Sequence, residues 1–297
     1  MGTLSKEALF DPMLVKDLVS KVKGKSSLAR LHGAEPLPFN GMKEFTFSMD
    51  NEVDIVAENG KKTHGGISLS PVTILPIKME YGARISDEFM HAAEEEQISI
   101  LQAFNDSFAV KVAKGLDIAA FHGLNPRSGV SSSVIGNNHF DKAVTQTVDY
   151  AAASIDENIE AAIALVEAAE GDISGMAVSP VARQALAALK NSKNERLYPA
   201  LAWGGDPGTI NGLMVDVNKT VATGGIDHAV VGDFASSFRW GYAKEIPMEI
   251  IEYGDPDSSG CDLKGYNQIY IRAEVYLGWG ILDPNAFARI INPANAG

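Results

Sequence analysis

The chain has 297 residues, 45% of them hydrophobic and 21% charged, which is enough for one large globular domain or two ordinary ones. These proportions exclude a disordered, collagen-like or coiled-coil protein, and no apolar stretch approaches the roughly 18 residues that a membrane-spanning helix needs. The net charge of −13 repels a phosphate backbone and argues against sequence-specific nucleic-acid binding, while a single cysteine excludes an internal disulfide framework.

The amino-terminal segment, residues 1–38, is predicted to be an arm that lies on another surface. Positions 1–34 hold six basic and three acidic residues, so a mildly basic arm precedes an acidic body. Its apolar residues are scattered and support at most short amphipathic turns. Such a segment cannot bury itself.

Residues 42–84 are predicted to form a long two-stranded excursion. Apolar residues alternate from Met42 and again over 53–56, and Asn59-Gly60 then gives the strongest short hairpin signal. The return arm contains two prolines, which mark an edge or irregular strand. Because a lone two-stranded ribbon is only marginally stable in water, we expect it to lean on another chain.

A long helix is predicted from about Asp87 to about Phe121, with Ser86 as its cap and acidic residues in its first turn. Apolar residues follow at three- and four-residue steps along one stripe: Ile98, Leu101, Phe104, Phe108, Val112 and Leu116. Gly123 and Pro126 end the helix, and a loop continues to Asn138.

The middle of the chain has an α/β pattern, and its end is rich in strands. One helix is predicted from Ser154, where a capping box begins, to about Ala169, and another from Ser179-Pro180 to about Lys190. The glycine-rich segment 203–208 is predicted to be a flexible loop. Strands are expected at residues 176–178, 213–217, 229–231, 238–242, 248–253 and 268–280, with a turn at 255–260.

Motifs that would carry chemistry are few. Gly24-Lys25-Ser26 imitates the end of a phosphate-binding loop but lacks the first glycine and a preceding strand. Residues 255–260 imitate the first half of a calcium loop, yet Tyr266 stands where a bidentate glutamate is required, so a hairpin turn is favoured. The six histidines show no paired metal spacing, and no serine elbow is present. We therefore predict no enzyme, no cofactor and no metal.

Several segments, in their order and spacing, carry a resemblance to a known family. They are Asp117–Gly123 with Pro126 and Gly129, then Asn211–Val215, Gly232–Phe234, Arg272–Gly280 and Asp283–Phe287. With them the chain resembles, over nearly its whole length, the major capsid protein of tailed bacteriophages. The resemblance implies the α+β Hong Kong 97-type fold, with an amino-terminal arm (1–38), an extended β-ribbon loop (39–84), a peripheral domain with a spine helix (85–140 and 240–297) and an α/β axial domain (141–239).

The resemblance also implies a function. Such a subunit self-assembles as pentamers and hexamers into an icosahedral head that encloses double-stranded DNA, and the virion is assembled in the cytoplasm of the bacterial host. Its implied partners are copies of itself, a portal and a scaffolding protein; because only some forty residues precede the ribbon, the scaffold is expected to be a separate protein or to be dispensable. Two alternatives stay open: an encapsulin-like nanocompartment shell, and a soluble α/β enzyme with an unrecognised site.

Some members of that family join neighbouring subunits by an isopeptide bond. The resemblance places Asn267 at the position of the amide, Lys61 or Lys62 at the ribbon tip as the nucleophile, and Glu274 at the position of the proton acceptor, which another subunit contributes. The alternative for Asn267 is the end of a turn, and the alternative for Glu274 is an ion pair with a neighbouring residue.

Overall fold

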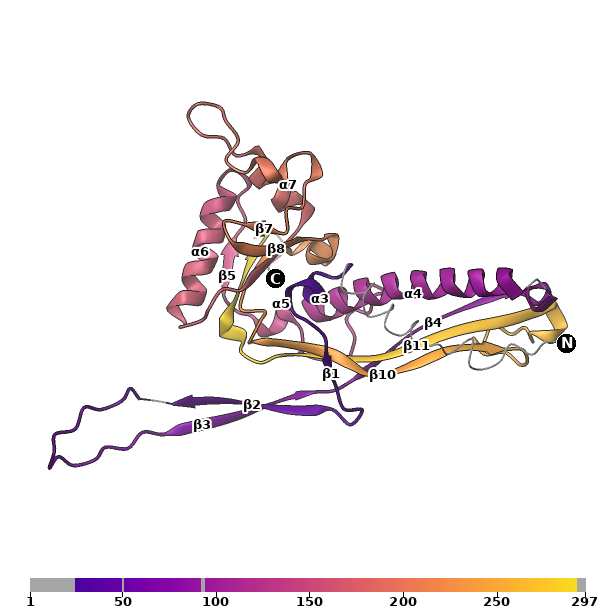
Figure 1. Ribbon diagram of the computed structural model, residues 1–297, viewed down its shortest axis with the longest axis horizontal. Helices are drawn as coiled ribbons and strands as arrows, with labels where there is room; N and C mark the ends of the chain where they lie inside the picture. Colours follow the sequence, from indigo (N-terminus) through magenta and orange to yellow (C-terminus); the bar gives the residue numbers. More distant parts are fainter. Residues whose placement is uncertain (1–24, 50, 92–93, 293–297) are drawn as a thin grey trace.

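The computed structural model describes residues 25–49, 51–91 and 94–292. It has three parts: a projecting two-stranded ribbon, a long four-stranded sheet covered by one helix, and a compact α/β unit (Figure 1). Most of the predicted arm and Gly24 of the phosphate-loop-like motif lie outside the described residues. Among the described residues, none of the helices combines the length and the hydrophobicity that a membrane span needs.

The four-stranded sheet has the order β1-β10-β11-β4, with β1 parallel to β10 and the other pairs antiparallel. Its strands are β1 (Glu35–Pro36), β10 (Phe238–Ile251), β11 (Gln268–Ile281) and β4 (Ile77–Ser86). The two strands predicted at 238–242 and 248–253 are in fact one, β10, because two register shifts against β11 let the strand continue through its irregular middle. The turn predicted at 255–260 joins β10 to β11.

The long helix α4 (Glu94–His122) runs along one face of this sheet (Figure 1). The predicted apolar stripe is confirmed in its centre, where Phe108, Val112 and Leu116 are buried against β11. The predicted start at Asp87 is wrong. The Ser86 hydroxyl accepts a hydrogen bond from the Glu88 amide, but it opens a separate 3-10 turn, η1 (Asp87–His91). At the other end Gly123 takes a left-handed φ of +66°, which closes the helix as predicted.

The α/β unit is built on a six-stranded sheet with the order β5-β12-β9-β6-β8-β7. Its strands are β5 (Thr147–Asp149), β12 (Phe287–Ile291), β9 (Asp227–Gly232), β6 (Gly175–Val178), β8 (Leu213–Val217) and β7 (Thr209–Ile210). Helices α6 (Ile155–Ala168) and α7 (Pro180–Ala188) pack their apolar sides against the same core. Further short elements are α3 (Ser27–Leu31), α5 (Phe140–Ala143), η2 (Ala152–Ser154), η3 (Pro199–Gly204), η4 (Lys219–Gly225), η5 (Lys264–Tyr266) and η6 (Pro284–Ala286).

The two predicted helix caps have different outcomes. The Ser179 hydroxyl accepts a hydrogen bond from the Ala182 amide and Pro180 follows in the first turn, as predicted. Ser154 precedes α6, but its side chain makes no capping hydrogen bond. The reason is that η2 runs directly into α6, so Ser154 does not have the extended backbone that a capping residue usually adopts.

The ribbon consists of β2 (Met42–Met49) and β3 (Ile67–Ile74), paired antiparallel. The predicted hairpin is confirmed, and the Gly60 amide donates to the Ala57 carbonyl in its turn. The prediction was wrong for residues 53–56, which lie in a long loop outside the strands. It was also wrong for the end of the return arm, because residues 77–86 form β4 and pair with β11 in the four-stranded sheet.

Candidate assembly surfaces

One face of the ribbon is apolar and has no cover among the described residues. The register pairs Met49 with Ile67 and Phe45 with Pro71, so these side chains share a face with Leu69. The exposed fractions are 57% for Phe45, 70% for Met49, 68% for Ile67 and 59% for Leu69. Apolar side chains gathered on one exposed face are typical of a protein interaction site.

Beyond the root of the ribbon, the opposite face is polar. Thr46 pairs with Ser70, and the Thr46 hydroxyl donates to the Ser70 carbonyl at 3.1 Å. Only the root of the ribbon is anchored, where Ile74 is buried beside Gly280 of β11. The strands therefore project from the body as an amphipathic arm (Figure 1).

The loop that joins the two strands, residues 51–66, is exposed throughout. It carries apolar side chains in full contact with water, and Ile55 is 97% exposed. Lys61 and Lys62 follow the turn and are exposed as well. The whole ribbon thus presents apolar surface that the single chain leaves uncovered.

The predicted cross-link residues do not meet within one chain. The loop with Lys61 and Lys62 lies at one end of the molecule, and the start of β11 lies at the other (Figure 1). Asn267 is exposed and ends η5 in a left-handed conformation with φ +52°, and its carbonyl accepts a hydrogen bond from the Asp87 amide at 2.9 Å. A lysine–asparagine bond would therefore have to join two subunits.

Glu274 has partners within its own chain. It is buried on β11 and pairs with Lys78 of β4 at 2.7 Å and with Arg272 at 3.4 Å. The ammonium of Lys78 has its pKa raised, chiefly by the hydrogen bond to Glu274. Glu274 thus helps to hold β4 against β11, the role that the alternative interpretation gave it.

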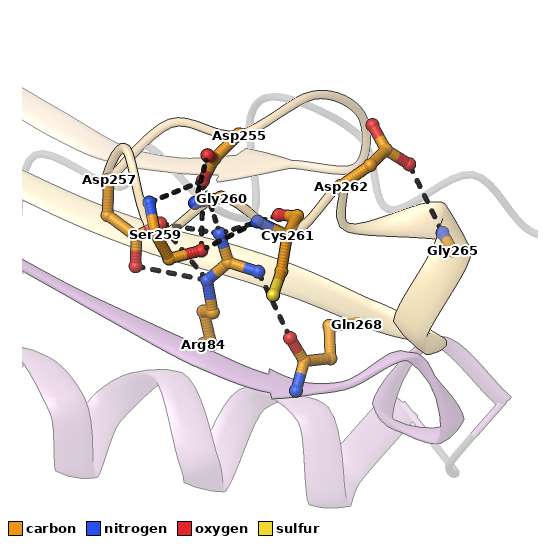
Figure 2. A network of polar contacts seen from close by, with 9 residues as sticks. All are labelled: Arg84, Asp255, Asp257, Ser259, Gly260, Cys261, Asp262, Gly265 and Gln268. Carbon is orange, nitrogen blue, oxygen red and sulfur yellow. Dashed lines mark hydrogen bonds and ion pairs between the residues drawn. The ribbon is translucent and has the colours of Figure 1, made fainter.

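The turn that resembles a calcium loop is held by an arginine (Figure 2). The guanidinium of Arg84 on β4 donates to Asp255 at 2.6 Å, to both oxygens of Asp257 at 3.0 and 3.1 Å, and to the Cys261 carbonyl at 3.0 Å. The hydrogen bond from Arg84 lowers the pKa of Asp257 to about 2. The guanidinium of Arg84 is therefore the cation that pairs with both carboxylates, and it ties the turn to β4.

A buried carboxylate connects the long helix to the amino-terminal segment. Asp117 on α4 is completely buried, and burial raises its pKa to about 6 although its hydrogen bonds act in the opposite direction. Its donors are the hydroxyls of Ser26 and Thr220, the backbone amides of Ser27 and Leu28, and the side-chain amide of Asn218 at 3.4 Å. Asp117 therefore joins α4, α3 and η4 at one point.

A second buried cluster lies at the end of the same helix. Arg289 on β12 donates to Asp227 on β9 and to Asp141 on α5, each at 2.8 Å, and His122 lies 2.9 Å from Asp141. Burial, together with the charge of Asp141, raises the pKa of Asp227 to about 7. The histidine and the two carboxylates are close enough to hold a metal ion, but the guanidinium already binds both carboxylates, so this is an ion-pair cluster that ties α4 to the six-stranded sheet.

Sequence reasoning did not identify these two clusters. Asp117 lies in a segment used for the family resemblance, and its position among apolar residues of the helix stripe is the available signal of a buried charge. Arg289, between Ala288 and Ile290, is a similar signal. Sequence spacing does not reveal the partners of either residue. The partners of Arg289 lie 62 to 148 residues away along the chain, and those of Asp117 lie about 90 to 103 residues away.

Comparison with known proteins gives a consistent result. The chain matches the model of the phage capsid family over residues 8–291. It is similar to a solved chain from Mycobacterium phage Ogopogo, with 34% identity and a TM-score of 0.77 over 90% of this chain and 92% of that one. It is also similar to a solved chain from Gordonia phage Cozz, with 25% identity and a TM-score of 0.75 over 90% of this chain and 86% of that one. A chain described as the capsid of an empty GTA particle computed with C5 symmetry shares the fold, with 15% identity and a TM-score of 0.64 over 90% of each chain. No curated protein matches the chain.

Proposed function

The chain belongs to the phage capsid family, and on that premise we propose how it assembles. It is a major capsid protein that associates with copies of itself into the icosahedral shell of a phage virion, and it is not an enzyme. The family match does not favour a nanocompartment shell or a soluble α/β enzyme.

The apolar face of the ribbon is the observation that carries the proposed mode of assembly. The ribbon projects with Met49, Ile67 and Leu69 exposed. A neighbouring subunit that covers this face stabilises the assembly by about 25 cal/mol per Å² of apolar area removed from water. We propose that each ribbon lies over an adjacent copy with this face down. The polar face with Thr46 and Ser70 then stays towards solvent.

Two adjacent residues of β3 provide a matched test. Leu69→Glu places a charge on the apolar face, and Ser70→Glu places the same charge on the polar face one residue away. Both positions are exposed in the single chain, so both variants are expected to fold with unchanged circular dichroism. Negative-stain microscopy and sedimentation should show shells or capsomers for the wild type and for Ser70→Glu, and dissociated subunits for Leu69→Glu. Shells of Leu69→Glu with wild-type yield would contradict the proposal.

The finer organisation is also part of this proposal. Pentamers and hexamers would form around the axial domain, and assembly in the host cytoplasm would use a portal and, where needed, a separate scaffolding protein. The net negative charge of the chain supports a shell that encloses double-stranded DNA without binding it sequence-specifically. Contact between the acidic body and the DNA would release few counterions from the phosphates, and that release is what drives protein–DNA binding. The proposed parts are 1–38, 39–84, 85–140 with 240–297, and 141–239, with two corrections. Strand β4 pairs with β11 of the peripheral domain, and strand β12 pairs with β9 of the axial domain.

The cross-link remains a prediction. In it, the neutral amine of Lys61 or Lys62 attacks the side-chain carboxamide carbon of Asn267 in another subunit, and Glu274, also from another subunit, takes the amine proton. A new carbon–nitrogen bond forms, the old one breaks, and Glu274 passes the proton to the leaving nitrogen, which departs as ammonia. Glu274 would first have to exchange its ion pair with Lys78. Boiling assembled shells in denaturant should give a ladder of linked chains that is lost in the double variant Lys61→Arg, Lys62→Arg. Monomer alone from wild-type shells would contradict the prediction.

A further inference from the structure

One of the three tryptophans is in a very different environment from the other two. Trp203 is 100% exposed, whereas Trp240 and Trp279 are each 2% exposed. The indole N–H of Trp240 donates to the His32 carbonyl at 2.8 Å, and that of Trp279 donates to the Asn138 carbonyl at 2.9 Å. Trp203 is thus the tryptophan left entirely in water, and a large exposed aromatic ring is unusual enough to need a reason.

The backbone at Trp203 is held in a sparsely populated conformation. Its φ of +59° and ψ of +25° lie in the left-handed region, which a bulky residue rarely adopts because it is energetically unfavourable. Gly204 follows with φ +86°, and a Cβ on Gly205 would lie 2.1 Å from the Ala200 carbonyl oxygen. The turn is therefore too tight to be a relaxed loop.

Two arginines hold the segment around Trp203. Arg183 of α7 donates to the Leu201 carbonyl at 3.0 Å, and Leu201 itself is buried. On the other side, Arg30 of α3 donates to Asp206 at 2.6 Å and to Asp216 of β8 at 2.7 Å. The segment 203–208 is a loop, as the sequence predicts, but it is fixed on both sides. The exposure of the indole ring is accordingly a property of the fold.

From this geometry we propose that Trp203 is an anchor of the contact between two copies of this chain in the shell. The inference rests on the proposed function, because a capsid protein meets copies of itself over much of its surface. Tryptophan is the residue type most enriched among energetically dominant interface residues. A ring on a fixed backbone also loses little conformational entropy on binding, since only two side-chain torsions must be ordered.

The charges around Trp203 favour a second copy as the partner. The segment 183–196, next to the η3 turn that carries Trp203, holds four basic residues and one acidic residue. Helix α6 holds four acidic residues and no basic one, and none of the four pairs with a cation among the described residues. Both charged segments belong to the α/β unit, and burial together with the nearby charges of Asp156 and Glu160 of α6 raises the pKa of Tyr198, the residue before η3. The basic segment of one copy can therefore face the acidic helix of the next, and such a head-to-tail contact closes into a ring when its rotation allows.

Fluorescence quenching tests the proposal. The difference between the emission of the wild type and that of Trp203→Phe isolates Trp203, because the other two tryptophans are buried in both. In dissociated subunits we expect this component to be quenched freely by acrylamide, and in assembled shells we expect its quenching constant to fall several-fold. Shells in which Trp203 is quenched as in dissociated subunits would overturn this inference alone. Failure of the wild type to form particles under any condition would overturn the proposed function and this inference with it.

The effect on assembly gives a second measurement. Trp203→Ala should raise the subunit concentration needed for assembly by about tenfold or more, which corresponds to about 1.4 kcal/mol per contact. Trp203→Phe should retain most of the assembly, because it keeps an aromatic ring on the same backbone. The midpoint of subunit unfolding should be unchanged in both variants, since the side chain contacts solvent. Equal assembly of Trp203→Ala and the wild type would contradict the proposal.

Discussion

Replacing the buried Asp117 by asparagine separates the charge of this residue from its shape. The carboxylate accepts hydrogen bonds from two hydroxyls, two backbone amides and one side-chain amide, so every polar neighbour is a donor. Asparagine offers one acceptor oxygen and points an NH₂ group at those donors. We expect at least one buried donor to lose its partner, which costs about 1–3 kcal/mol. The substitution also removes the cost of burying a charge, which opposes that loss.

The magnitude follows from the pKa. In the folded chain the pKa of Asp117 is raised to about 6 from 3.8, so the folded state binds the proton more tightly. The stability gained from this proton is complete below pH 3.8 and is lost as the pH rises through 6. Over the whole pH range, a pKa shift of this size changes the free energy of unfolding by about 3 kcal/mol. Lowering the pH from 7 to 5 accounts for about 1.4 kcal/mol of this gain in stability. At pH 7 the lost hydrogen bond and the relieved charge nearly cancel, and Asp117→Asn is close to neutral.

Urea unfolding of dissociated subunits at pH 7 and pH 5 measures this difference. Because asparagine does not titrate, Asp117→Asn should be less stable than the wild type by about 1.4 kcal/mol more at pH 5 than at pH 7. Asp172→Asn, which changes an exposed carboxylate, should follow the wild type at both values. Parallel pH profiles for Asp117→Asn and the wild type would refute the reasoning, since burial would then not have raised the pKa.

Three further substitutions test other parts of the structure. Arg84→Gln should expose the turn between β10 and β11 to limited proteolysis, because it removes the cation that holds two carboxylates there; unchanged cleavage would count against that role. Gly241→Ala should detach β1, since its Cβ would lie 1.8 Å from the Glu35 carbonyl oxygen, and faster amide exchange in β1 would report it. Arg289→Leu should lower the urea unfolding free energy by about 3–5 kcal/mol, because it leaves Asp227 buried without its cation.

Several elements could be predicted from the sequence because their causes are local. The turn at Asn59-Gly60 and the start of α7 at Ser179-Pro180 are found where the sequence places them, although a long loop separates that turn from the paired strands. The centre of α4 is found for a similar reason, since periodic burial needs no knowledge of the partner surface. The strand β12 was not predicted as an element. A short run that is buried on both faces has no alternation to reveal it.

Only the tertiary structure decides which charges meet. Arg84 holds a turn about 173 residues away, and Asp117 binds the amino-terminal segment about 90 residues away. Both contacts depend on how strands and helices pair across the chain, which spacing cannot specify. Long-range contacts also fix the exposed Trp203. Arg30 of α3 and Arg183 of α7 hold the segment around it, although the composition of that segment alone predicts a flexible loop. The local sequence determines the elements, and the long-range packing determines the sites.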